Sequence, residues 1–200
     1  MVYLLYEYLL RRKLDENMFP EEICFMLSEA DFLANPGRVE TVCRWCMDFP
    51  AIKKIIFHIS SKNPNSQKEM TPLLQNLADT ATVRISTPSG EETFGTGQPE
   101  ILLVIGRSGR EEITDAIIQI AKEEIDPAEI TEETIESHLR YQVNPDFVIK
   151  TGGSHLTDFL IWQSVYSELF FTDVNWNRFR RLDLLRALRD YQTRIRRYGQ

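Results

Sequence analysis

The chain has 200 residues, of which 42% are hydrophobic and 26% are charged, and its formal net charge is −7. This length and composition predict a single globular domain and exclude a fibrous or disordered chain. The acidic balance disfavours nucleic acid as a partner, because phosphate backbones bind basic surfaces.

Residues 1–18 are predicted to form an N-terminal amphipathic helix. The apolar run contains Glu7 and is followed by Arg11, Arg12 and Lys13, which reverses the charge order of a signal peptide. Such a helix usually packs on a core or a partner, and contact with a membrane surface is the second interpretation. No apolar run approaches the roughly 20 residues of a transmembrane helix. We therefore expect a cytoplasmic protein, with membrane association as an additional property.

Short, nearly all-apolar runs alternate with helical patterns along the rest of the chain, as in a parallel sheet whose strands are buried on both faces. The predicted fold is α/β, an open, mostly parallel six-stranded sheet flanked by helices, in one domain of residues 1–200 that ends in a helix and tail at 182–200. Strands are predicted at 23–27, 54–59, 82–86, 101–105, 147–149 and 169–171. Helices are predicted at 39–47, 70–78, 111–124, 131–139, 159–165 and 182–196, and loops at 60–67, 88–99 and 151–155.

Three cysteines, Cys24, Cys43 and Cys46, are too few and odd in number for a disulfide framework, and they fit a reducing compartment. Cys43 and Cys46 have the C-x-x-C spacing, but they lie inside a predicted helix, whereas a redox motif opens one. We interpret all three as packing cysteines.

Ligands of open parallel sheets bind beyond the carboxyl ends of the strands. The site is therefore expected where Ile59, Ile105 and Lys150 end their strands. Between residues 178 and 197 there are eight arginines and no lysine. Arginine suits recognition of a diphosphate or a carboxylate, although a solvated helix face explains most of these residues as well.

Residues 146–173 contain Lys-Thr-Gly-Gly, then Phe-Leu-Ile-Trp-Gln-Ser, then Tyr-Ser-Glu-Leu-Phe-Phe-Thr-Asp. This order resembles the C-terminal signature of the cis-prenyltransferases, the undecaprenyl diphosphate synthase family, which elongate allylic diphosphates with isopentenyl diphosphate. The Gly-Arg-Glu-Glu-Ile run at 109–113 resembles the family's Gly-Gly-Arg-x-Glu-Ile turn. The chain's end, with Arg197, Tyr198 and Gly199, resembles the family's Arg-x-Gly tail.

The same resemblance implies that the catalytic loop has been replaced. In the family the first strand leads into Asp-Gly-Asn-x-Arg, whose aspartate serves the metal-assisted chemistry. Here Ser28 stands at the aspartate, Glu29 at a glycine and Asp31 at the arginine. Two carboxylates in a place meant for a diphosphate would repel it by about 1–4 kcal/mol each at 4 Å.

The second half of the family's site is implied to be altered but partly kept. The resemblance makes Lys150, His155 and Thr157 residual substrate-binding residues, with Lys150 in place of an arginine. Lysine keeps the charge but loses the bidentate geometry, and a loop or capping role is the alternative for His155. Glu168 matches an acid that helps to place the metal, with a structural role as its alternative.

This combination resembles the non-catalytic, Nogo-B-receptor-like subunit of heteromeric cis-prenyltransferases. The resemblance implies a heterodimer or heterotetramer with a catalytic homologue that binds isopentenyl and allylic diphosphates and holds most of the Mg²⁺. Arg197, Tyr198 and Gly199 would reach the diphosphate in the partner's site, across an interface built from residues 159–176. The product would be a long-chain polyprenyl diphosphate for a glycosyl-carrier lipid. The alternatives are a self-sufficient homodimeric transferase and a non-enzymatic protein that binds prenyl chains.

Overall fold

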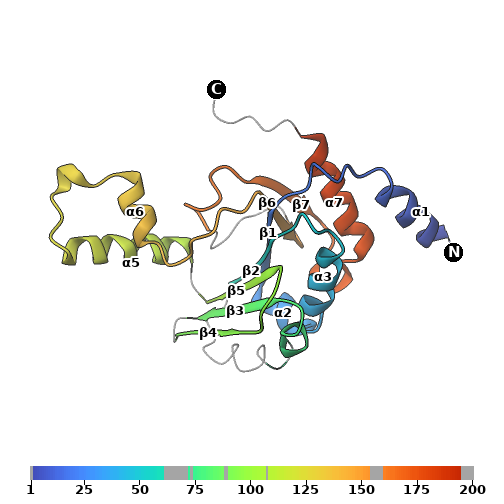
Figure 1. Cartoon of the computed structure of the whole chain (residues 1–200), viewed down its shortest axis with the longest axis horizontal. Coiled ribbons are helices and arrows are strands. Elements are labelled where there is room, and N and C mark those ends of the chain that lie inside the picture. Colours follow the sequence, from blue (N-terminus) through green and yellow to red (C-terminus); the bar gives the residue numbers. More distant parts are fainter. Residues whose placement is uncertain are drawn as a thin grey trace.

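The computed structural model describes residues 2–60, 72, 74–87, 90–106, 108–153 and 160–194. Its centre is a seven-stranded sheet of order β4-β3-β5-β2-β1-β6-β7 (Figure 1). All neighbouring strands pair in parallel except β3 and β4. The strands are β1 (Glu22–Ser28), β2 (Lys54–Ser60), β3 (Thr82–Thr87), β4 (Gly90–Phe94), β5 (Glu100–Ile105), β6 (Phe147–Thr151) and β7 (Glu168–Thr172). The predicted α/β fold with a mostly parallel sheet is confirmed, with one strand more than expected.

The additional strand, β4, comes from the predicted loop 88–99. It pairs antiparallel with β3, from Thr87 opposite Gly90 to Val83 opposite Phe94. Gly95 ends this strand with a φ of +75°, and a Cβ there would collide with the carbonyl oxygens of Ala78 and Ala81. The exposed Glu-Glu-Thr run at its centre has low strand propensity, so the sequence alone indicates a loop.

The helices are α1 (Val2–Arg11), α2 (Glu29–Ala34), α3 (Arg38–Met47), α5 (Gly109–Lys122), α6 (Glu132–His138) and α7 (Arg181–Thr193). Short 3₁₀ turns lie at η1 (Gln75–Leu77), η2 (Pro127–Glu129) and η3 (Trp176–Arg178). The helices predicted at 39–47, 111–124 and 131–139 are confirmed, and Thr131 and Thr134 form the expected capping box of α6. The helix predicted at 70–78 lies partly outside the described residues, and η1 falls within its range.

The helix predicted at 159–165 is wrong over its described residues. Residues 161–166 form turns, with one helical hydrogen bond from Ser164 N to Leu160 O at 3.1 Å. A single helical turn without propagation is unfavourable, because few hydrogen bonds offset the ordering of the backbone. Here Gln163 fixes the turn instead, by donating from Nε2 to Glu112 Oε2 at 3.0 Å.

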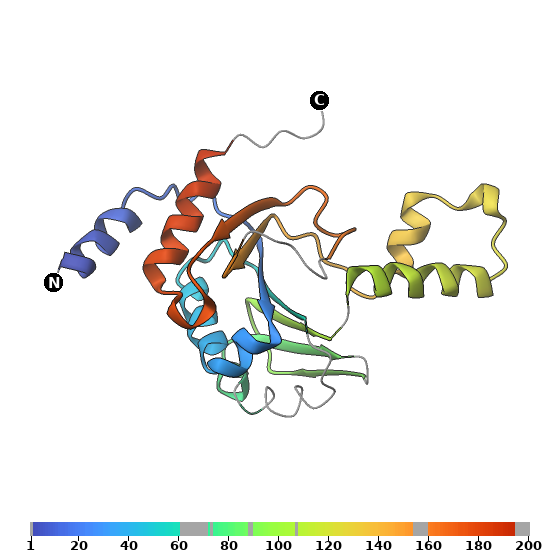
Figure 2. The same cartoon turned by 180° about the vertical axis from the view of Figure 1, so that it is seen from behind.

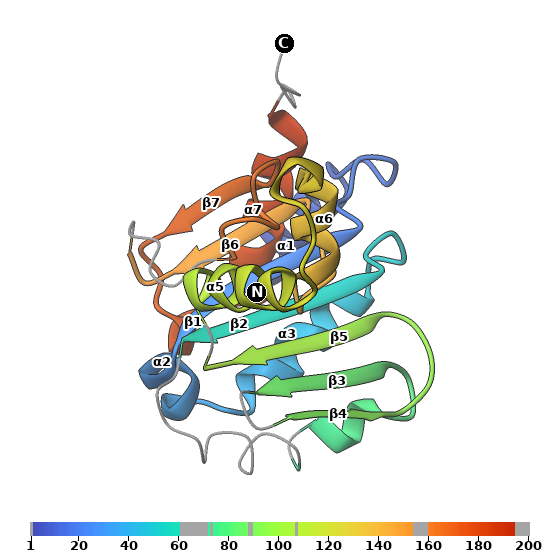
Figure 3. The same ribbon diagram turned by 90° about the vertical axis from the view of Figure 1, so that its left-hand side faces the viewer.

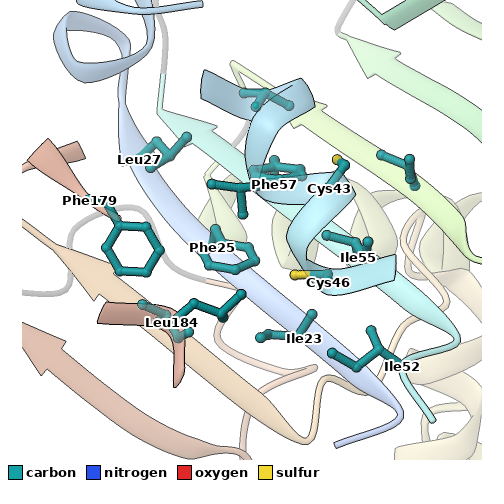
Figure 4. Packing of buried hydrophobic residues seen from close by; sticks show 14 of the residues in the cluster. Ile23, Phe25, Leu27, Cys43, Cys46, Ile52, Ile55, Phe57, Phe179 and Leu184 are labelled. Carbon is teal, nitrogen blue, oxygen red and sulfur yellow. The ribbon is translucent and has the colours of Figure 1, made fainter. Parts of the chain in front are cut away.

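The core lies on both faces of the sheet. Ile23, Phe25 and Leu27 alternate onto the face that α3 and α7 cover, where Phe25 stacks on Phe57 at 5.2 Å between ring centroids (Figure 4). Cys24 and Met26 point to the other face, where they pack with a smaller group that includes Tyr141, Val143 and Leu160. Each large side chain buried in this way contributes about 1.5–3 kcal/mol, which makes the first face the main source of stability.

The cysteines belong to this core. Cys43 and Cys46 lie within α3 and face the sheet beside Ile55 and Phe57 (Figure 4), and both are fully buried free thiols. Burial raises the pKa of Cys43 well above its ordinary value, and it raises the pKa of Cys24 to about 12. Such protonated thiols are poor nucleophiles and poor metal ligands, which fits the packing interpretation.

Two segments extend from opposite sides of the sheet. The helices α5 and α6 form an arm that projects away from the body, while α1 lies beyond α7 on the far side (Figures 1 and 2). Within the arm, His138 at the end of α6 contacts Glu123 after α5, with 3.1 Å between Nε2 and Oε2. Both segments expose apolar side chains, because neither is enclosed by the rest of the chain.

Candidate functional site

The parallel strands all end on the same side of the sheet, which we call the carboxyl edge, and α2 lies at this edge (Figure 3). The register places Ser28 of β1 opposite Ser60 of β2, and Ile59 opposite Ile105 of β5. On the other side of β1, Met26 is opposite Lys150 of β6. The strand ends that the sequence assigns to the site are therefore neighbours, at the edge where open parallel sheets bind ligands.

The turn after β1 is the start of a helix. Ser28 is the N-cap of α2: its Oγ accepts a hydrogen bond from Asp31 N at 3.1 Å and donates one to Asp31 Oδ2 at 2.6 Å. Asp31 Oδ2 also accepts from Ser28 N at 3.4 Å, which completes a capping box. Phe32, which is buried to 1% exposure, anchors the helix in the core.

This arrangement leaves the turn unsuited to an anion or a metal ion. A helix N-terminus attracts anions through its unpaired N–H groups and its dipole. In α2 the carboxylates of Glu29 and Asp31 occupy the first turn, so negative charge is already in place. Over the described residues, no group of three or more metal-ligating side chains comes together. Mg²⁺ needs only one or two carboxylates besides substrate phosphates and water, and in this turn the Asp31 carboxylate is instead bonded to the N–H and the hydroxyl of Ser28.

The end of β6 carries the residues expected for a residual substrate site. Lys150 is half-buried, and its Nζ donates to Thr151 O at 3.0 Å. Gly152 has a φ of +70°, which favours glycine, and its N–H donates to Thr172 O and Val174 O at 2.9 and 3.1 Å. The start of the loop is thereby fixed against β7, with the Lys150 cation beside it.

Five predicted site residues lie outside the described part of the chain. They are His155 and Thr157 after β6, and Arg197, Tyr198 and Gly199 at the C-terminus. Their roles remain predictions from the sequence.

Glu168 lies at the opposite end of the sheet. It begins β7 and is opposite Phe147, the first residue of β6, about 16 Å along the strands from the level of Ser28. It accepts a hydrogen bond from Arg194 Nη1 at 3.2 Å, and Arg194 also contacts Asp190 and the carbonyl of Leu169. Burial opposes the charge of Arg194 and tends to lower its pKa. The hydrogen bonds to Glu168 and Asp190 outweigh this effect and raise the pKa of Arg194 above its ordinary value. Within this chain Glu168 therefore anchors the end of α7.

Two features of this region escaped the sequence analysis. One is a basic cleft of about 630 Å³ at the carboxyl edge, where Arg38 meets Arg178, Arg180 and Asp173. Arg38 Nη2 donates to Asn177 O at 3.0 Å, which holds the start of α3 against η3. The run of arginines from residue 178 was the available signal, but nothing in the sequence placed Arg38 beside it.

The other feature is a buried carboxylate. Glu112, exposed by only 3%, accepts from Tyr141 N at 2.8 Å and from Gln163 Nε2 at 3.0 Å. It joins the base of α5 to the segment before β6 and to the turn at 161–166. Such a charge is costly to bury unless it is hydrogen-bonded, so these bonds fix the base of the arm.

The turn at 161–166 forms an apolar surface outside the core. Ile161, Val165 and Tyr166 are exposed by 43%, 67% and 80%. Beside them lies a cleft of about 410 Å³, whose lining also includes Glu136 and Asp146. An apolar surface with a polar rim of this kind is typical of protein interfaces.

Comparisons with known proteins extend over both halves of the chain. The family model described as "Putative undecaprenyl diphosphate synthase" matches residues 74–199, so the turn after β1 lies outside the match. The chain is 29% identical to the tritrans,polycis-undecaprenyl-diphosphate synthase (geranylgeranyl-diphosphate specific) of Methanopyrus kandleri, over 100% of this chain and 92% of that protein. It is 33% identical to the synthase of the same name from Thermoplasma volcanium, over 82% of this chain and 78% of that protein.

A solved structure has the same fold. The lavandulyl diphosphate synthase of Lavandula x intermedia, in complex with dimethylallyl diphosphate, superposes with a TM-score of 0.69 over 92% of this chain and 100% of that chain. At 17% sequence identity this likeness concerns the fold alone. The alignment with the Methanopyrus kandleri protein spans 248 positions, more than the 200 residues of this chain, so that relative carries segments that this chain lacks.

Proposed function

Because the chain belongs to the undecaprenyl diphosphate synthase family of cis-prenyltransferases, we propose that it is the non-catalytic subunit of a heteromeric Z-polyprenyl diphosphate synthase. In this assembly a catalytic homologue binds the isopentenyl and allylic diphosphates and holds the Mg²⁺. The product is a long-chain polyprenyl diphosphate, the precursor of a glycosyl-carrier lipid.

The observation that carries this proposal is the capping box at the start of α2. A catalytic loop needs a carboxylate that can bind a metal ion and N–H groups that can bind a diphosphate. Here the Asp31 carboxylate is bonded to the N–H and the hydroxyl of Ser28, and the first turn of α2 carries two carboxylates. The segment thus contributes to stability in the place where the family's chemistry would begin.

The contribution of the chain to its partner's site is assigned to Arg197 and Gly199 in the C-terminal tail. This assignment rests on the resemblance of the tail to the family's Arg-x-Gly ending. It is supported by the way α7 ends, because Arg194 is bonded to Glu168, to Asp190 and to the carbonyl of Leu169. A fixed starting point for a tail lowers the entropy cost of placing it in a neighbouring site.

The proposed interface includes the turn at 161–166 and the arm. Ile161, Val165 and Tyr166 are exposed on the turn that precedes β7, the strand at one edge of the sheet. The arm exposes Ile117 and Ile118 by 54% and 46%. Exposed apolar side chains on a projecting helix pair support an assembly in which a second body packs against them.

The test is the incorporation of labelled isopentenyl diphosphate into elongated product, with an allylic primer and Mg²⁺. The purified chain is assayed alone and after co-expression with a catalytic homologue from the same genome. We expect no elongation by the chain alone, and co-purification with turnover above that of the homologue alone in the mixed complex. Elongation by the chain alone would overturn the proposal.

A self-sufficient homodimeric transferase is the second candidate. It is favoured by the comparison with the Methanopyrus kandleri protein, which is itself named as a synthase and aligns with the whole chain. In that case Lys150, with its half-buried cation at the carboxyl edge, is the described residue to test first. Lys150→Met should then abolish the elongation that the chain performs alone.

A further inference from the structure

The first helix, α1, has two different faces. Toward the body, Leu10 is 4% exposed, Glu7 pairs with Arg181 at 3.1 Å, and Arg186 lies 5.7 Å from the ring centre of Tyr6. These contacts hold α1 against α7.

The outward face carries Leu5, Tyr8 and Leu9, which are exposed by 60%, 56% and 47%. Their spacing of i, i+3 and i+4 places them on one stripe of the helix. We refer to these three residues as the outer strip.

Basic residues follow the outer strip directly. Arg11 is the last residue of α1, where a cation is favourable, and Arg12 and Lys13 follow it. Arg12 lies 5.7 Å from the ring centre of Tyr8. Of the neighbouring acids, Glu7 and Asp48 both pair with Arg181. Asp15 Oδ1 accepts from Asn17 N at 2.9 Å, and the exposed Glu16 is a further carboxylate after this end of α1. Three consecutive cations therefore directly follow the outer strip, although the net charge of the chain is −7.

We propose that the outer strip of α1 binds the surface of an anionic lipid bilayer, with the helix lying in the plane of the interface. Leucines penetrate the boundary between headgroups and acyl chains, tyrosines favour the headgroup level, and adjacent cations attract anionic lipids. The acidic remainder of the protein opposes this contact only weakly, because charges beyond about 10 Å are screened at 0.1 M salt. Over the described residues no helix could cross a membrane, so the contact is peripheral.

The position of α1 favours a bilayer over a protein as the occupant. The apolar turn at 161–166 and the arm lie on the other side of the molecule from α1 (Figures 1 and 2). A partner chain seated on them leaves the outer strip uncovered. The choice of a bilayer rests in part on the interface given in the proposed function, but vesicle binding is measured without substrate and without the catalytic homologue, so the two proposals can fail separately.

The experiment is co-sedimentation of the full chain with vesicles of phosphatidylcholine, with or without phosphatidylglycerol. We expect binding to the mixed vesicles, weaker binding to pure phosphatidylcholine, and a decline as salt is raised. The double variant Leu5→Gln/Leu9→Gln should lower the partition coefficient roughly tenfold or more, because it removes most of the apolar area of the strip. The variant Arg12→Gln/Lys13→Gln should lose mainly the preference for phosphatidylglycerol.

The matched control is Leu33→Gln on α2, which changes a leucine of similar exposure, 44%, outside α1 and should bind like the wild type. Tyr8→Ser is a second probe of the outer strip. Thermal unfolding shows whether each variant is folded, so a folding defect in one variant does not decide the outcome. Equal vesicle binding by the wild type and both folded strip variants would overturn the proposal. A second result would also overturn the proposal: the wild type binds no vesicles but forms an oligomer, and the strip variants do not form it. The outer strip would then join two copies of the chain.

Discussion

At the scale of single residues, the turn after β1 shows how two side chains can start a helix. Serine followed three residues later by an acid is a helix-capping signature, and Ser28 with Asp31 forms such a box. The resemblance alone implied that these two residues replace members of the family's catalytic loop. Their hydrogen bonds to each other give them a structural role, which is to start α2.

This role leads to a prediction for Asp31→Ala. The variant should lose about 1 kcal/mol of unfolding free energy, because Ser28 N–H and the helix start lose their partner. Turnover of the mixed complex should change less than twofold. Urea unfolding measures the first quantity, and incorporation of isopentenyl diphosphate measures the second.

The control is Ser28→Ala, alone and combined with Asp31→Ala. Because both side chains belong to one capping box, the double variant should cost less than the sum of the single variants. A large loss of turnover in Asp31→Ala at unchanged stability would instead mean that this carboxylate acts in the reaction.

At the scale of secondary-structure elements, the arm has a contact that responds to pH. His138 Nδ1 lies 2.7 Å from Thr134 O, and its Nε2 lies 3.1 Å from Glu123 Oε2. These contacts, first to the Thr134 carbonyl and then to Glu123, raise the pKa of His138. The charged imidazolium therefore favours the closed arm. The contribution is fully present below the unfolded pKa, near 6.5, and is lost as the pH rises through the higher folded value.

We predict that α6 loosens as the pH rises above about 6.5, the unfolded pKa of histidine. After correction for the intrinsic rate, amide hydrogen exchange in α6 should accelerate above this pH in the wild type. In His138→Gln it should be fast throughout and independent of pH. Amides of β2, in the middle of the sheet, are the internal control. If the variant kept the wild-type pH dependence, another group would be responsible.

The elements that the sequence predicted well have strong local signals. Four of the five central strands, β1, β2, β5 and β6, are nearly continuous apolar runs, and the start of α6 carries the capping pair Thr131 and Thr134. The errors arose where tertiary contacts override local pattern. The charged strand β4 is held by pairing with β3, and the helix expected at 159–165 gives way to turns that are fixed by a distant residue, Glu112. Neither partner is visible from the segment itself.

At the scale of the whole molecule, the proposed assembly predicts that Arg197→Ala acts on the partner's chemistry. Loss of a charge-assisted hydrogen bond to a diphosphate should lower the turnover of the mixed complex roughly 10- to 100-fold, with normal co-purification. The assay is incorporation of isopentenyl diphosphate per purified complex. Arg189→Ala, at an exposed arginine on α7, is the matched control and should retain turnover. An unchanged turnover in Arg197→Ala would remove the role of the tail.

The sequence could predict only those parts of the candidate site that lie within a single segment of the chain. Motif order located Lys150 and the turn after β1, and the alternation of strands and helices placed both at the carboxyl edge of the sheet. The basic cleft could not be found in this way, because Arg38 and Arg178 are far apart in the chain and meet only through the packing of α3 against η3. Glu168 was linked to the metal by resemblance, and its bond to Arg194 emerges only when α7 lies beside β7.

The two edge strands of the sheet differ in how readily each would accept a strand from another chain. One edge is β4, whose exposed Glu91 and Glu92 would face the same carboxylates if the β4 strand of a second copy were added there. The hydrogen bond from Ser86, ahead of those from Arg140, lowers the pKa of Glu91, so this edge stays charged in mild acid. The other edge is β7, which exposes Phe171 by 40%. We therefore expect pairing of two β4 edges to be disfavoured, which leaves β7 as the edge more open to a strand of another chain.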